Sequence, residues 1–197
     1  MREETADMNA EKHNGGRTAL IVIDLQTAMF DGVATPPIYE ADALAERSGA
    51  VIEWARQRGL DVAFIRHDGP PGDPLAPAEP GWPLLSALGR REEEPIFSKT
   101  VGDAFSQPAL KTWLQDRGAH KLVLIGAQTD ECVAATVSGG LQNGYDVVVL
   151  SDVHSTWPQG GETAAQIIAR HNDMFADAGA RVMPAADIIN DGDDASR

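Results

Sequence analysis

The sequence has one cysteine, few positive charges and no long apolar run. A single cysteine in 197 residues excludes an internal disulfide framework and a metal site built from several cysteines. No apolar run approaches the about 20 residues that a membrane-spanning helix needs. The formal net charge of −14 argues against nucleic acid and anionic membrane as partners. Because residues 1–16 contain no apolar signal-peptide core, we expect a cytoplasmic protein.

The chain does contain enough apolar sequence for one core. Its hydrophobic content of 43% and charged content of 23% are typical of a soluble globular protein. A length of 197 residues favours one domain. Residues 1–16 and 191–197 are polar, so we expect two flexible tails around a single domain at residues 17–190.

Five stretches are apolar and show little alternation with polar residues, and residues 95–98 are a shorter candidate. Apolar runs of this kind are typical of parallel strands that are buried on both faces. The predicted strands are residues 18–24, 60–66, 95–98, 121–126, 146–151 and 180–184.

Helical patterns lie between most of these strands, with apolar residues three or four positions apart. The predicted helices are residues 40–58, 106–117 (with Ser106 as N-cap), 131–143 and 161–178. Alternating strands and helices predict an α/β fold with a doubly wound, mostly parallel sheet. Residues 67–94, rich in Pro and Gly, break the alternation and are typical of a functional lid or binding loop.

Ligands of doubly wound sheets bind at the carboxyl ends of the strands. The polar residues predicted at that edge are Asp24, Gln26, Arg66, His67, Asp68, Ser98, Lys99, Gln128, Cys132, Asp152 and His154. The topology therefore brings a cysteine, a lysine and an aspartate to one edge of the sheet.

Those three side chains suit acyl transfer through a thioester. A free thiol has a pKa of about 8.5 and is mostly protonated at neutral pH. A helix N-terminus capped by Thr129 or Asp130, together with the charge of Lys99, would favour the Cys132 thiolate. Asp24 could take the thiol proton and deliver it to a leaving amine. Free backbone N–H groups in the first helical turn could hold an oxyanion.

Each candidate also has a structural interpretation. A lone cysteine is commonly a small buried hydrophobe, Asp24 could cap a turn, and Lys99 could be an exposed surface lysine. His67 and Asp68 could bind a metal, although no second histidine lies nearby in the sequence.

Two further alternatives concern the pocket around the thiol. Asp152 and His154 could form a Cys-His-Asp protease site. The candidate substrate-binding residues are Gln26, Phe30, His67, Trp82, Phe105 and Trp157. Gln26 also fits a loop hydrogen bond, and the four aromatic residues Phe30, Trp82, Phe105 and Trp157 also fit core packing.

Three segments, in this order, resemble the isochorismatase-like cysteine hydrolases. TALIVIDLQTAMF contains Asp24, IFSKTVGDAF contains Lys99, and LVLIGAQTDECVAATVSGGLQNGYDVVVLSDV contains Cys132. The resemblance covers residues 17 to 190. The string GAQTDECV, preceded by HDGPPGDPLAPAEPGW, is similar to the streptothricin-hydrolase-like branch of the superfamily.

The resemblance implies a single-domain, three-layer, Rossmann-like fold and a catalytic triad of Cys132, Asp24 and Lys99. It also implies a cis peptide bond between Ala127 and Gln128, with the amides of Gln128 and Cys132 forming an oxyanion hole. We further expect a homodimer or higher homo-oligomer that acts on a small molecule.

Departures from the superfamily narrow the expected chemistry. Nicotinamidases bind a metal through an Asp-x-His pair and a further histidine, and His67 and Asp68 do not form that pattern, so we expect no metal and no cofactor. Isochorismatases proper cleave a vinyl ether and commonly lack the cysteine. Cys132 therefore favours a cysteine-dependent amidohydrolase that cleaves a C–N bond in a small amide, lactam or imide. The alternatives are an ether hydrolase that uses Asp24 and Lys99 without the thiol, and a non-catalytic α/β binding module.

Overall fold

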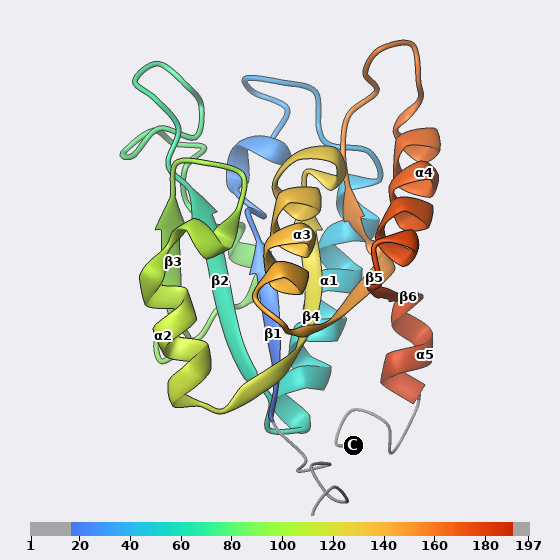
Figure 1. Ribbon diagram of the computed structural model, residues 1–197. Coiled ribbons are helices and arrows are strands. Elements are labelled where there is room, and N and C mark those ends of the chain that lie inside the picture. Colours follow the sequence, from blue (N-terminus) through green and yellow to red (C-terminus); the bar gives the residue numbers. More distant parts are fainter. Residues whose placement is uncertain (1–16, 191–197) are drawn as a thin grey trace, which may run out of the picture.

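A computed structural model of the chain describes residues 17–190 and is built on one six-stranded sheet (Figure 1). Every neighbouring pair of strands is parallel, in the order β3-β2-β1-β4-β5-β6. The strands are β1 (Arg17–Ile23), β2 (Asp61–His67), β3 (Ile96–Lys99), β4 (Ala119–Ala127), β5 (Asp146–Ser155) and β6 (Arg181–Met183). The predicted α/β fold is confirmed, and the sheet is parallel throughout. The two predicted tails lie outside the described residues.

The apolar runs form strands because both faces of the sheet are covered. In β1 every residue after Arg17 is buried. Leu20 and Val22 face one core cluster, and Ile21 and Ile23 face the other, because successive side chains of a strand point to opposite faces. A strand with an apolar residue at every position is therefore stable only between two layers of helices.

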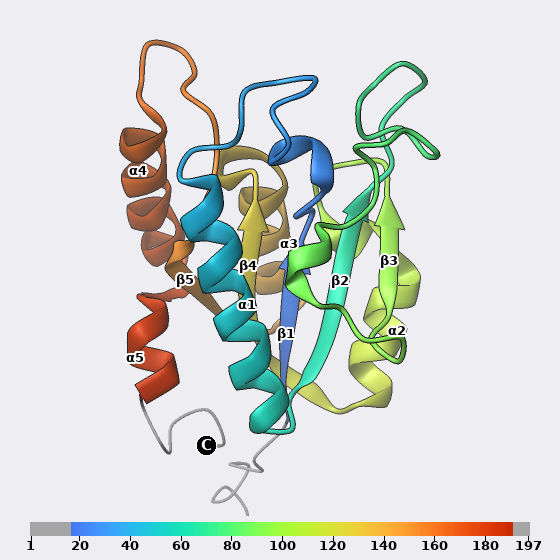
Figure 2. The same ribbon diagram turned by 180° about the vertical axis from the view of Figure 1, so that it is seen from behind.

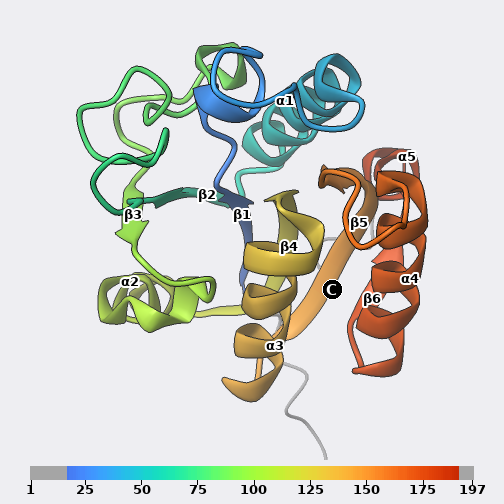
Figure 3. The ribbon, with the colours of Figure 1, turned by 90° about the horizontal axis from the view of Figure 1, so that it is seen from above.

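Five α-helices form those two layers within residues 17–190. One core cluster includes buried residues of α1 (Ala41–Gln57) and α5 (Ala185–Asn190). In Figure 2, α1 lies in front of the sheet. The other core cluster includes residues of α2 (Pro108–Asp116) and α4 (Ala164–Asp177) and the start of α3 (Ala134–Gln142). Viewed along the strands, α1 lies on one side of the sheet and α2 and α3 lie on the other (Figure 3). None of the described helices is long and apolar enough to cross a membrane.

Helix starts depart from the sequence prediction where a local polar contact decides them. Ser106 does not cap α2, because it ends a 3-10 turn, Ala104–Ser106, whose N-cap Asp103 accepts from the Phe105 amide at 2.8 Å. Pro108 then opens α2. In α4, Thr163 and Gln166 form a capping box, so the helix begins at Ala164 rather than near residue 161.

The long segment 67–94 is held against the turn that follows β1. The Thr27 amide donates to the Pro83 carbonyl at 2.9 Å, and the Ala28 amide donates to the Gly81 carbonyl at 3.0 Å. A Cβ on Gly81 would lie 2.4 Å from the Cβ of Ala28, so the two segments touch through a position that only glycine fits. This part of the segment is therefore anchored at the carboxyl edge of the sheet.

Candidate active site

Asp24, Lys99 and Cys132, from three separate segments, meet at the carboxyl edge of the sheet. Lys99 Nζ lies 2.5 Å from Asp24 Oδ2 and 3.2 Å from Cys132 Sγ. The side chains of Lys99 and Asp24 are completely buried. Since a buried charge is stable only when it is paired, the lysine and the aspartate each depend on the other.

Close approach of β1 and β4 brings the end of β4 beside Asp24. A Cβ on Gly126 of β4 would lie 2.1 Å from the carbonyl oxygen of Ile23, and Gly126 has a φ of 138°. Only glycine fits there. Asp24 itself has a left-handed backbone with a φ of 49°, a conformation that recurs in functional sites when it is found outside glycine.

Cys132 lies in a π-helical turn, Thr129–Val133, rather than in the first turn of an α-helix. The amides of Glu131 and Val133 both donate to the Gln128 carbonyl, at 3.2 and 3.0 Å. The peptide bond between Ala127 and Gln128 is cis, as the resemblance implied. Single π-helical turns of this kind are frequent at functional sites.

The expected N-cap at Thr129 or Asp130 is wrong. No side chain caps this turn, because the Thr129 side chain binds β5 and the Asp130 side chain binds Thr156, the residue after that strand. The Thr129 hydroxyl lies 2.9 Å from His154 Nδ1, and the Thr156 hydroxyl donates to Asp130 at 2.5 Å. These contacts fix the turn that carries Cys132 to the neighbouring strand.

The environment of Cys132 favours the thiol over the thiolate. Burial, reinforced by the Asp24 carboxylate, raises the pKa of Cys132 to about 12, and the charge of Lys99 offsets this only in part. Lys99 thus favours the thiolate as expected, but burial and Asp24 outweigh it, so the sulfur keeps its proton. A base must remove the proton before the sulfur can act as a nucleophile, and Asp24 is the carboxylate beside it.

The Gln26 side chain is buried and binds backbone groups, so it is not part of an open pocket wall. Its amide nitrogen donates to the carbonyls of His67 at 3.0 Å and Trp82 at 2.8 Å. Its amide oxygen accepts from the His67 backbone N–H at 2.8 Å. Gln26 therefore ties β2 and the long loop to β1, and its side chain is completely buried.

The side chain of Trp82, within the same loop, binds residues at the end of β2 and just after it. Its indole N–H donates to Asp68 at 2.8 Å, and the guanidinium of Arg66 lies 3.6 Å from the centroid of its ring. Arg66 also donates to the hydroxyl of Ser98 at 3.0 Å. Because the Asp68 carboxylate binds Trp82 in this cluster, the alternative in which His67 and Asp68 bind a metal has no geometric support.

The remaining aromatic candidates lie in different places. Phe105 is buried in the core, where its ring stacks on Tyr145 with the centroids 5.5 Å apart, so it does not line a pocket. Phe30 and Trp157 are half-buried against the other core cluster. The Trp157 indole N–H donates to the Pro36 carbonyl at 2.7 Å, which joins two loops at the carboxyl edge.

His67 comes from β2, which lies between the strands of Asp24 and Lys99. Its register partner on β3 is Lys99 itself. A ring nitrogen of His67, a carboxylate oxygen of Asp24 and Cys132 Sγ all lie within 4.8 Å of one another. Within residues 17–190 this is the one group of three His, Cys, Asp or Glu side chains close enough to share a metal ion.

His154 and Asp152 do not form a protease-like site with the cysteine. His154 is buried between Thr129 and Asn172, whose Oδ1 lies 3.0 Å from Nε2. Because Asn172 donates its amide to Ser151, its oxygen faces the ring, so Nε2 carries the proton and Nδ1 accepts from Thr129. Burial lowers the pKa of His154 to about 4, which keeps the ring neutral.

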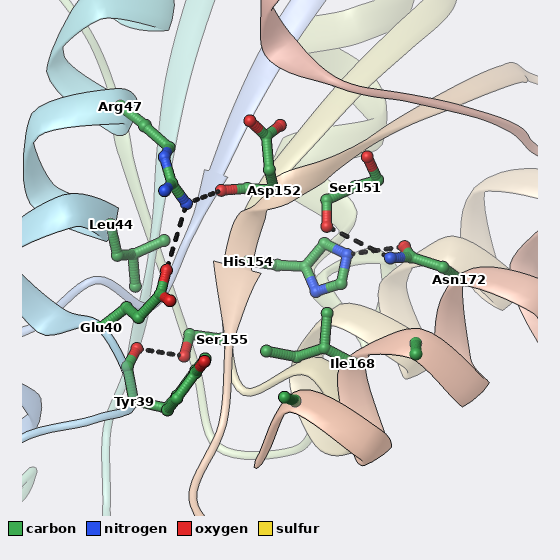
Figure 4. A pocket seen from close by; sticks show the side chains of 12 residues that line it. Tyr39, Glu40, Leu44, Arg47, Ser151, Asp152, His154, Ser155, Ile168 and Asn172 are labelled. Atoms are coloured by element: carbon green, nitrogen blue, oxygen red, sulfur yellow. Dashed lines mark hydrogen bonds and ion pairs between the residues drawn. The ribbon is translucent and has the colours of Figure 1, made fainter.

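Asp152 has a structural contact of its own. Its carboxylate accepts from the Ala185 amide at 2.8 Å, at the start of α5. Figure 4 shows His154 and Asp152 at a separate cavity of about 260 Å³, which also includes Arg47 and Glu40 of α1 and the segment before it. This cavity does not include Asp24, Lys99 or Cys132.

The sequence does not reveal the contacts through which β5 and α4 support the turn that carries Cys132. The contacts of Thr129 with His154, of His154 with Asn172, and of Asp130 with Thr156 join residues 18 to 26 positions apart. No motif in the sequence marks them, because the pairing depends on the crossover from β4 to β5.

Comparison with known proteins places the chain in a family. Its sequence matches the isochorismatase domain over residues 18–187. A streptothricin hydrolase from Streptomyces noursei is 34% identical over 139 residues, which are 71% of this chain and 50% of that protein. A ureidoacrylate amidohydrolase, RutB, from Klebsiella pneumoniae is 28% identical over an alignment of 186 positions that covers 76% of this chain and 78% of that protein.

The fold is shared as well. A crystal structure from Oleispira antarctica, classed among the isochorismatase hydrolases, has a TM-score of 0.83 and 28% identity, covering 91% of this chain and 99% of that one. The chain spans about half the length of the streptothricin hydrolases that it matches. The family match extends over nearly all of the described residues, and the chain therefore belongs to the isochorismatase family of hydrolases.

Proposed function

We propose that this protein is a cysteine-dependent amidohydrolase that cleaves a C–N bond in a small amide, lactam or imide. One observation carries the proposal: the Lys99 ammonium lies 3.2 Å from the sulfur of Cys132 and 2.5 Å from the carboxylate of Asp24. A nucleophile, a base and a fixed positive charge within one buried cluster are the parts that thioester formation needs.

In the first half of the proposed reaction Cys132 attacks the amide carbonyl carbon. Asp24 takes the thiol proton, which the raised pKa of Cys132 otherwise holds on the sulfur. The C–N bond then breaks, Asp24 delivers the proton to the leaving nitrogen, and the acyl group stays on sulfur as a thioester. Lys99 balances the negative charge that passes between carboxylate and sulfur.

In the second half a water molecule attacks the thioester with Asp24 as the base. The acid product leaves, and the sulfur regains its proton. We assign the oxyanion of both tetrahedral intermediates to the backbone amides of Gln128 and Cys132. Their segment is supported by the bonds of Thr129 to His154 and of Asp130 to Thr156.

The names of two relatives support the proposed bond type. The streptothricin hydrolase and the ureidoacrylate amidohydrolase are both hydrolases, and the second is an amidohydrolase by name. We assign Phe30, Trp82 and Trp157 to the surroundings of the substrate, because all three are half-buried. The two tryptophans also fix loops at the carboxyl edge. We also predict that a second subunit helps to close the substrate pocket. A cytoplasmic location is a further prediction.

A panel of small amides, lactams and imides, assayed for ammonia or amine release, tests the proposal. We expect turnover in the wild type, none in Cys132→Ala, and a covalent acyl adduct on Cys132 after rapid quenching with acid. The expected loss in Cys132→Ala is about 1000-fold or more, since the nucleophile itself is removed. Equal turnover in wild type and Cys132→Ala would refute the cysteine mechanism.

The same variant separates the two alternatives. An ether hydrolase that uses Asp24 and Lys99 alone would cleave a vinyl ether equally well after Cys132→Ala. A non-catalytic binding module would give no turnover in either protein and no acyl adduct on the thiol. Gel filtration with light scattering measures the predicted homo-oligomer.

A further inference from the structure

Two polar atoms beside Cys132 have no hydrogen-bond partner within the described chain. They are Oδ1 of Asp24 and Nδ1 of His67, and both atoms are buried. The other carboxylate oxygen of Asp24 is bound by Lys99. Buried polar atoms are nearly always hydrogen-bonded, because an unpaired one loses its contact with water without replacement. Because the Asp24 and His67 side chains also meet beside Cys132, their unpartnered atoms point to a polar occupant.

The two side chains are close enough to bind the same small group. A ring nitrogen of His67, a carboxylate oxygen of Asp24 and the sulfur of Cys132 lie within 4.8 Å of one another. Gln26 fixes the backbone position from which the ring projects, because it binds both the N–H and the carbonyl of His67. A group bound to the ring and the carboxylate would lie next to any acyl group carried by the sulfur.

The charge of the cluster decides what kind of occupant fits. Thiolate, imidazole and carboxylate are all metal ligands by type. However, Lys99 Nζ lies 2.5 Å from the Asp24 carboxylate and 3.2 Å from the Cys132 sulfur, so a positive charge already stands between two of the three ligands. A metal cation would be repelled by that ammonium in a buried site, where screening is weak. A neutral hydrogen-bonding group meets no such repulsion.

We propose that His67 and Asp24 together bind the water molecule that hydrolyses the thioester. This inference rests on the proposed cysteine mechanism. One O–H of the water donates to Asp24 Oδ1 and the other to His67 Nδ1, which leaves a lone pair on oxygen for the carbonyl carbon. Asp24 takes one proton as the C–O bond forms, the C–S bond breaks, and the proton passes to sulfur. In the preceding acylation step the leaving nitrogen occupies the same position, because attack and departure use one side of the carbonyl.

An activated ester isolates the water-dependent step. With p-nitrophenyl acetate the leaving group needs no protonation, so acetylation of Cys132 proceeds without help at the water position. Release of p-nitrophenolate then gives a burst for acetylation and a slower steady state for hydrolysis. Intact-protein mass spectrometry follows the acetyl group, and with one cysteine in the chain a thioester has a single site.

Three substitutions separate a water-binding role from a structural one. His67→Leu keeps the volume and removes the polar atom. His67→Asn places an amide atom where Nδ1 was, whereas His67→Gln reaches to the position of Nε2. Circular dichroism and thermal unfolding check each fold, and the Asn and Gln pair decides the matter if the Leu variant does not fold.

We expect the burst to persist in every variant while the steady-state rate changes. His67→Leu should slow hydrolysis by about 10-fold to 100-fold, since loss of one positioning contact commonly has an effect of this size, and the acetyl-enzyme should accumulate. His67→Asn should recover more of the rate than His67→Gln. A burst and a steady state that fall by the same factor, or equal rates in Asn and Gln, would overturn the inference.

Failure of the inference is distinct from failure of the proposed function. If wild type forms an acetyl-enzyme that Cys132→Ala does not form, and His67→Leu hydrolyses it at the normal rate, only the role of His67 is lost. If the wild type forms no adduct on Cys132 with any activated ester or amide, the cysteine mechanism fails and the role of His67 with it.

Discussion

The ammonium of Lys99 lies 2.5 Å from the carboxylate of Asp24, and neither side chain is exposed to solvent. The two residues stand 75 positions apart and come from strands that are not adjacent in the sheet. Removing two charges from water is expensive, and the pair regains the loss only while both partners are present. The pair is thus a structural element as well as the proposed charge system of the site.

Breaking this pair should destabilise the protein strongly. Lys99→Met leaves the Asp24 carboxylate buried without its partner, so the free energy of unfolding at pH 8 should fall by about 3 kcal/mol or more. Urea unfolding measures the loss. The double variant Asp24→Asn with Lys99→Met should be more stable than Lys99→Met alone, because no unpaired charge is left.

The exposed pair of Arg170 and Glu162 provides the matched control. Its side chains are 46% and 42% exposed, and solvent screens exposed ion pairs. Arg170→Met should therefore change the stability little. A loss in Lys99→Met no larger than that in Arg170→Met would contradict the buried-pair interpretation.

Alkylation of Cys132 should report its raised pKa. Since burial and Asp24 raise the pKa to about 12, the rate with iodoacetamide should increase about 10-fold per pH unit from pH 7 to 10, without a plateau. Asp24→Asn should speed alkylation at pH 8, because the negative charge that holds the proton on sulfur is gone. Lys99→Met should slow it. A plateau below pH 9 in the wild type would show that the resting site already stabilises the thiolate.

The buried His154 should make the protein sensitive to acid. Its pKa is lowered from 6.5 to about 4, so between these pH values the unfolded chain binds a proton that the folded protein does not. Stability should therefore fall as the pH drops from 6.5 to 4, by about 3 kcal/mol from this residue. Urea unfolding at several pH values measures the slope.

A variant isolates that contribution from other groups. Burial and Arg170 also lower the pKa of His171, which acts in the same direction. His154→Gln cannot titrate in this range, so its stability should fall less steeply than that of wild type. Identical slopes in the two proteins would mean that other groups cause the acid sensitivity.

Local patterns in the sequence were sufficient for the sheet and for the three residues of the proposed triad. Apolar runs predict all six strands, and the rule that ligands bind at the carboxyl edge predicts that Asp24, Lys99 and Cys132 lie together. The rule worked because parallel strands all end at the same edge, so sequence order alone decides which residues meet there.

Side-chain roles were harder to predict, because they depend on partners far away in sequence. From the sequence, Gln26 is a candidate for substrate binding or for a loop hydrogen bond, and the structure shows that it joins two segments through backbone groups of His67 and Trp82. Phe105 fits a pocket wall or the core equally well from the sequence, and its ring lies in the core against Tyr145. The thiol pKa followed the same logic. The sequence predicts that Lys99 lowers the pKa of Cys132. The larger increase of that pKa through burial depends on how the chain packs around the sulfur.

Gly126 offers a stringent test of how the site is assembled. A side chain there would meet the Ile23 carbonyl oxygen at 2.1 Å, at a φ of 138° that other residues rarely adopt. Gly126→Ala should push β4 away from β1, lower the stability by about 2 kcal/mol or more, and displace Cys132 from Asp24. The loss of amide turnover should exceed what the unfolded fraction explains.

Gly49 is the matched control, because it lies inside α1 with nothing within 4 Å of an added Cβ. Gly49→Ala should stabilise the protein by up to about 1 kcal/mol, since alanine favours a helix more than glycine does. The same chemical change is thus expected to act in opposite directions at the two positions. Full activity and wild-type stability in Gly126→Ala would mean that the contact of β1 with β4 does not set the distance between Asp24 and Cys132.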